Sequence, residues 1–158
     1  MGLMTVYKLG YGLDGNLCLI KEKDTMYSGE ITVSIGKTAY GILEQVFYPA
    51  IEAESTLYMM ALDSRNKVLG LFKVSHGSMK CTLLNLQGIF TRAVICGASG
   101  IIVAHSHPGV GCEITGEDEA YCKELRKASE LMGITLIDYM ILGNMEYISF
   151  REKGLLGE

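Results

Sequence analysis

The chain has 158 residues, the usual size of one folded domain, and 49% of them are hydrophobic, with a mean hydropathy of +0.24. This composition excludes a disordered chain and supplies a sizeable core without disulfide bonds. The net charge of -4 and scattered basic residues weaken any reading as a protein that grips nucleic acid through a basic patch.

Cysteine usage and the N-terminus point to a cytoplasmic protein. The cysteine count is five, an odd number, and no C-x-x-C pair occurs, which argues against a disulfide framework or a cysteine-based zinc knuckle. Reduced thiols in the cytoplasm fit better. We expect no signal peptide, because the start of the chain lacks a charged end and a long apolar core. No apolar run reaches transmembrane length, so we expect no membrane partner.

The first half of the chain predicts strands, then a helix, then a hairpin. Residues 1–34 read as short strands separated by turns, the last of them ITVSI at 31–35. From 36 to 53 the apolar residues have helical spacing, interrupted by Pro49. Residues 56–62 read as a buried strand, which the turn DSRNK joins to a second strand, VLGLFKVS.

The second half alternates helices and strands. Residues 82–97 have helical spacing, and IIVAH at 101–105 reads as a short buried strand. Thr115 is a candidate helix N-cap, with three acids in the first turn and Gly133 as the end of the helix. Two paired strands, ITLIDYMILG and MEYISF, follow. This order predicts an α/β fold with a single mixed sheet flanked by helices, in one domain over 1–158.

Two histidines at the exit of the buried strand suggest chemistry. His105 and His107 have i, i+2 spacing and so share one side of the chain, and Asp118 follows in the first helical turn. Two imidazoles and one carboxylate form the kind of set that catalytic zinc sites use, with the fourth position left to water. The alternative is a polar loop after a strand, in which Asp118 only complements the helix dipole.

This stretch resembles a known family. H-S-H-P-G, then Thr115, then Asp118 is similar to the H-x-H-x(7)-S-x(2)-D signature of JAMM metalloproteases, the JAB/MPN domain, and most of all to the RadC branch. LYMMALDSRNKVLG, VSHGSMK, FTRAVICGASGIIVAHSHPG and the end LMGITLIDYMILGNMEYISFREKGLL also resemble RadC segments. The resemblance covers 52–156. Residues 1–50 do not clearly match and show no helix-hairpin-helix segment of the kind found in longer relatives.

The resemblance implies a three-layer fold related to cytidine deaminases, and a Zn²⁺ ion held by the two histidines and Asp118. Thr115 takes the place of a serine that stabilises the oxyanion. The family places a general-base glutamate eight residues before the aspartate of the L-D turn, and here that position is Ser55. Glu54 becomes the candidate base if a bulge begins the strand, with Glu52 also close. The alternative is that Glu54 is an exposed acid.

Three functions follow. The first is a zinc-dependent hydrolase that cleaves a peptide or isopeptide bond in a peptide or protein substrate. The others are a DNA-repair or DNA-processing factor of the RadC type and a non-catalytic JAB/MPN binding module. A nucleoside deaminase is set aside, because its H-x-E and P-C-x-x-C motifs are missing. Cys112 is expected to fill the metal loop rather than bind the ion, and His76 to be an ordinary polar residue.

Overall fold

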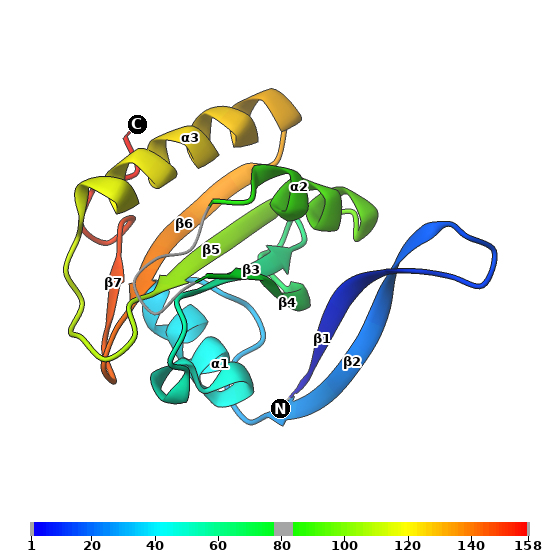
Figure 1. Ribbon diagram of the computed structural model, residues 1–158, viewed down its shortest axis with the longest axis horizontal. Coiled ribbons are helices and arrows are strands. Elements are labelled where there is room, and N and C mark those ends of the chain that lie inside the picture. The colour runs from blue at the N-terminus through cyan, green and yellow to red at the C-terminus, as the bar shows by residue number, and fades with distance from the viewer. Residues whose placement is uncertain (1, 78–83, 158) are drawn as a thin grey trace.

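A computed structural model describes residues 2–77 and 84–157. In these ranges a seven-stranded mixed sheet has the strand order β2-β1-β4-β3-β5-β6-β7, and helices flank it (Figure 1). The predicted α/β class with one mixed sheet is therefore confirmed. Most of VSHGSMK lies within the described residues, but its last three residues and the start of the predicted helix over 82–97 lie outside them.

The described elements follow one another along the chain, and most of them fall where the sequence predicts them. They are β1 (Gly2–Tyr11), β2 (Leu17–Tyr27), α1 (Gly36–Phe47), a 3-10 helix η1 (Pro49–Ile51), β3 (Thr56–Leu62), β4 (Val68–His76), α2 (Leu86–Ile95), β5 (Gly100–Ser106), α3 (Gly116–Met132), β6 (Thr135–Leu142) and β7 (Tyr147–Ser149).

One predicted strand is wrong. Residues 31–35 form no strand, and only Thr32 makes an isolated bridge, to Lys67. The segment instead runs past the turn between β3 and β4, where the backbone N–H of Val33 donates to the carbonyl of Asn66 at 2.8 Å. Val33 is buried in the core beside α1, so the chain follows that core into the helix rather than joining the sheet.

The sheet separates two hydrophobic cores. Helix α1 packs on one face, while α2 and α3 cover the other, which gives the three layers visible in Figure 1. Strands β3 and β5 are buried at all seven of their positions, so both of their faces are covered. Along β3, Met60 and Leu62 face α1, whereas Met59 and Ala61 face the other two helices. This alternation explains why the two strands read as continuous apolar runs.

The centre of the sheet positions the end of β5. Strand β5 pairs antiparallel with β3 and parallel with β6, and α3 forms the connection from β5 to β6. The register sets His105 opposite Leu57 on one side and opposite Ile141 on the other. Residues at the carboxyl end of β5 are therefore fixed by neighbours on both sides, close to where α3 begins.

Packing at β3 predicts a large effect of truncation there. Leu62 is fully buried, whereas Leu13 in the β1–β2 turn is fully exposed. We expect Leu62→Ala to lower the free energy of unfolding by about 2–5 kcal/mol, because the truncation removes buried methyl groups and leaves a cavity in a close-packed core. Leu13→Ala should change it by less than about 0.5 kcal/mol. Urea unfolding of both variants checks this, and equal losses would contradict the described core.

Candidate metal centre

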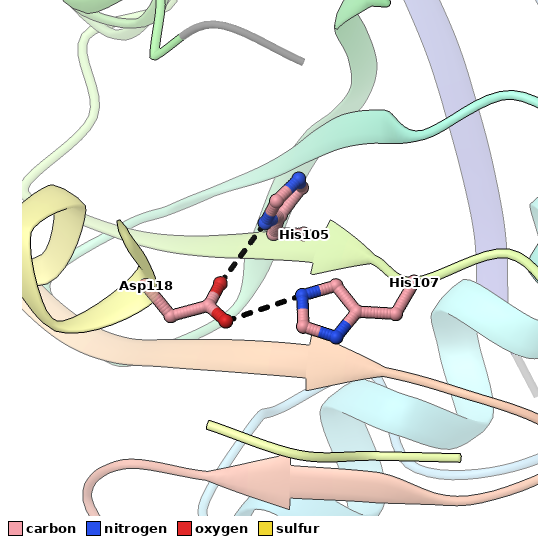
Figure 2. Close-up of side chains that lie close together, drawn as sticks. All are labelled: His105, His107 and Asp118. Atoms are coloured by element: carbon pink, nitrogen blue, oxygen red, sulfur yellow. Dashed lines mark hydrogen bonds and ion pairs between the residues drawn. The ribbon is translucent and has the colours of Figure 1, made fainter. Parts of the chain in front are cut away.

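Three side chains meet at the end of β5. His105 lies on the strand, His107 follows it, and Asp118 comes from the first turn of α3 (Figure 2). His105 Nδ1 lies 3.0 Å from Asp118 Oδ1, and His107 Nε2 lies 3.2 Å from Asp118 Oδ2. One ligand atom from each residue lies within 4.8 Å of the others, so the group can hold a metal ion. The residues predicted from spacing are thus brought together.

The separations suit a small cation. Two ligands bound tetrahedrally to zinc at about 2.0–2.1 Å lie about 3.3 Å apart. The two nitrogen–oxygen distances here, 3.0 and 3.2 Å, are near that value but run to different oxygens of Asp118, and one ligand atom from each of the three residues lies within 4.8 Å of the others. The side chains of His105 and Asp118 are at most 4% exposed, and that of His107 is 14% exposed. The group is therefore held by the fold, with its more open side at His107.

The start of α3 holds Asp118 in place through a capping box. Thr115 Oγ1 accepts a hydrogen bond from the backbone N–H of Asp118, and the Thr115 backbone N–H donates to Asp118 Oδ2 at 3.1 Å. The Thr115 hydroxyl also donates to Asp118 Oδ2, at 2.8 Å. The predicted N-cap is confirmed. Its hydroxyl donates its proton to the carboxylate that faces the histidines.

Asp118 is ionised despite complete burial. Burial alone raises the pKa of this carboxyl, but hydrogen bonds from His105, His107 and Thr115 outweigh it and hold the pKa well below its usual range. The buried Tyr139 hydroxyl also donates to Asp118 Oδ1, at 3.2 Å. Burial, and then the charge of Asp118, raise the pKa of Tyr139 well above its ordinary value, so it remains a donor. An ionised carboxylate is the form that binds a metal ion.

Ser55, not Glu54, contacts His105. Ser55 is buried, and its Oγ lies 2.8 Å from His105 Nε2. The carboxylate of Glu54 instead lies 2.9 Å from Nδ1 of His76, and both of these side chains are more than half exposed. Glu52 pairs with Lys73 at 2.7 Å. Among the described residues, neither glutamate belongs to the group that can hold a metal ion.

Cys112 fills the loop beside the site. Its thiol donates to the backbone carbonyls of Glu146 at 3.2 Å and Ile141 at 3.5 Å. Burial and the charge of Glu146 raise the pKa of the thiol to about 11, which keeps it protonated. A protonated thiol is a poor metal ligand, and Cys112 is absent from the metal-binding group in the described part of the chain. These contacts agree with the expected packing role.

Sequence reasoning missed two residues around this centre. Tyr139 lies on β6, where its alternation with apolar neighbours marks only a buried strand position. Ser106 anchors the start of β3, since its hydroxyl accepts from the backbone N–H of Thr56 at 2.8 Å. No spacing signal marks either residue, because both contacts join segments far apart in the sequence.

Comparison with known proteins gives one family. The model of a RadC-like JAB domain matches residues 36–155. That range begins earlier than the resemblance over 52–156 and includes α1, while the β1–β2 hairpin lies outside it. In the part of the chain that the structure describes, no helix has the length and apolar character to cross a membrane.

Curated bacterial relatives carry the name UPF0758 protein. The relative from Pelobacter propionicus is 35% identical over 98 residues, which are 62% of this chain and 43% of that protein. The one from Aquifex aeolicus is 36% identical over 105 residues, 66% of this chain and 46% of that protein. The one from Actinobacillus pleuropneumoniae serotype 5b is 32% identical over 102 residues, which are 65% of this chain and 46% of that protein. The alignments thus span less than half the length of these relatives.

The capping box predicts how the helix start responds to mutation. Thr115→Val keeps the shape of the side chain but removes the hydroxyl that caps α3 and donates to Asp118. We expect it to lower the free energy of unfolding by about 0.5–2 kcal/mol, whereas Thr115→Ser retains most of the stability. Urea unfolding measures both, and a valine variant as stable as the wild type would contradict the capping role.

Proposed function

The chain belongs to the RadC-like JAB domain family, and from this premise we propose that it is a zinc-dependent hydrolase of the JAMM type. The proposed reaction is cleavage of a peptide or isopeptide bond. The observation that supports it most is the meeting of His105, His107 and Asp118 at the end of β5, where one ligand atom from each residue lies within 4.8 Å of the others. The range matched by the family model, 36–155, includes these three residues.

The proposed roles follow from the surroundings of each side chain. When bound, zinc supplies Lewis-acid chemistry, because it lowers the pKa of a water molecule towards neutrality and polarises a carbonyl group. Asp118 contributes a fixed negative charge, which Tyr139 and Thr115 orient by donating to its two oxygens. The partly open side chain of His107 marks the side from which a substrate carbonyl approaches. Thr115 is the proposed donor to the developing oxyanion, and for this its hydroxyl must turn away from Asp118 Oδ2.

Glu54 is the proposed general base. Its carboxylate would take a proton from the attacking water and pass it to the leaving amine. For this it must give up its contact with His76, which joins two exposed side chains and is therefore weak. The start of β3 lies beside the end of β5, so Glu54 is next in sequence to a residue that touches His105.

One observation favours a second candidate, a non-catalytic binding module that keeps the metal. Ser55 occupies the position that faces His105, and a serine hydroxyl does not accept a proton from water as a carboxylate does. In this candidate the zinc ion stabilises the end of β5 and the start of α3, and the domain recognises a protein partner without cleaving it.

Zinc binding is the first test. The purified chain should bind about one zinc ion, and His105→Ala, His107→Ala and Asp118→Ala should each lose most of the affinity, since each removes one of three ligands. His76→Ala is the matched control, because it changes the only other histidine in the chain. Elemental analysis and calorimetric titration measure this. A wild-type chain that neither retains nor regains zinc would refute the proposal.

Hydrolysis separates the two candidates. With a quenched fluorescent peptide library as substrate, the zinc-loaded chain should show activity that a chelator removes. Glu54→Gln should lower the rate by about 10²–10⁴-fold if Glu54 is the base, while Glu52→Gln should leave it unchanged. Full activity in Glu54→Gln would exclude Glu54. If the wild type binds zinc but cleaves nothing, and Ser55→Glu gains activity, the binding module is the better description.

The DNA-processing alternative stays a prediction. It expects binding to duplex DNA that weakens steeply as salt rises, because phosphate contacts release counterions. No binding in a low-salt filter or fluorescence assay would exclude it, and the net charge of -4 gives it no support.

A further inference from the structure

We propose that Ser55 is a positioning residue for the metal centre, which holds the ring of His105 with Nδ1 toward Asp118 and Nε2 away from it. This inference rests on the proposed zinc site and adds a residue to it. Ser55 is 1% exposed, and its Oγ has two partners, His105 Nε2 at 2.8 Å and the backbone carbonyl of Ser106 at 3.0 Å. Ser55 therefore contacts the imidazole ring at Nε2, on the side opposite to Nδ1, the nitrogen that contacts Asp118.

Counting protons gives the direction of each bond. A serine hydroxyl has one proton, and a backbone carbonyl only accepts, so the proton of Ser55 goes to Ser106. Toward His105, Ser55 is therefore the acceptor, and Nε2 carries a hydrogen. Because Ser55 holds the hydrogen of Nε2, the nitrogen left to bind a metal ion is Nδ1, which faces Asp118.

Nδ1 of His105 faces the carboxylate of Asp118. Nδ1 and Asp118 Oδ1 are 3.0 Å apart in a buried site, so either a hydrogen or a metal ion has to lie between them. A bound metal ion meets this requirement. His107 presents the other type of nitrogen, Nε2, to the same carboxylate. The two histidines are thus expected to bind the ion through different ring nitrogens.

The backbone around Ser55 is anchored, so its hydroxyl has a fixed position. The carbonyl of Ser55 accepts from the backbone N–H of Gly77 at 2.9 Å. The next residue, Thr56, exchanges two hydrogen bonds with the Ser106 hydroxyl, at 2.8 and 3.3 Å. These bonds tie the start of β3 to β4 and β5. A partner that fixes the ring of a ligand in this way typically contributes 10–100-fold to metal affinity.

Zinc affinity tests the inference. We expect Ser55→Ala to weaken zinc binding by about 10–100-fold in a competition titration against a chromophoric chelator. Ser55→Thr, which keeps the hydroxyl, should recover most of the loss. Ser64→Ala is the matched control, because it makes the same change in an exposed turn at the other end of β3 and should bind zinc like the wild type.

A second measurement reports which nitrogen of the His105 ring binds the metal ion. A purely structural loss of stability would not change this pattern. Long-range ¹H–¹⁵N correlation spectra of the zinc-loaded chain should show His105 with hydrogen on Nε2 and metal on Nδ1, and His107 the reverse. Ser55→Ala should lose this single pattern for His105 while His107 keeps its own.

The outcomes are distinguishable from those of the proposed function. Coordination of His105 through Nε2, or wild-type zinc affinity in Ser55→Ala, would overturn the role of Ser55 and leave the hydrolase proposal standing. Zinc binding with the expected ring pattern but no hydrolysis would support Ser55 and count against the hydrolase. A wild-type chain that binds no zinc would overturn both.

Discussion

The buried carboxylate of Asp118 is the interaction on which the centre depends. It joins three elements, because it caps α3 through Thr115, contacts both histidines at the end of β5 and accepts from Tyr139 on β6. Leaving such a charge without partners in a buried site would cost several kcal/mol. The fold therefore has to bring α3 and the strands together at Asp118. The two histidines that help to keep Asp118 ionised are also the residues that could hold a metal ion together with it.

Local patterns in the sequence predicted much of the candidate metal centre. His105, His107, Thr115 and Asp118 lie within fourteen residues, so their relation follows from a strand end, a short loop and a helix cap. The buried strands β3 and β5 were also predictable, because a strand covered on both faces is apolar throughout. The predicted strand at 31–35 failed, since that segment has strand-like composition but the core beside α1 takes Val33 instead.

Contacts between distant segments were not predictable in the same way. Whether Ser55 or Glu54 faces His105 depends on how β3 and β5 are aligned, and a shift of one residue exchanges the two faces of a strand. The sequence marked position 55 through a resemblance and raised Glu54 as its substitute, but only the pairing puts Ser55 against the ring. The role of Tyr139 was not predictable for the same reason, because its partner Asp118 lies twenty-one residues away in another element.

The pairing of β3 with β5 also has a consequence for when the candidate metal centre forms. Ser55 and His105 are separated by fifty residues, so their contact closes a long loop and has to wait for the central strands to align. During synthesis the two histidines leave the ribosome before Asp118, so the three-residue group is incomplete at that stage. The geometry of the candidate metal centre is thus completed late in folding, by assembly of the sheet rather than by the order in which its residues are synthesised.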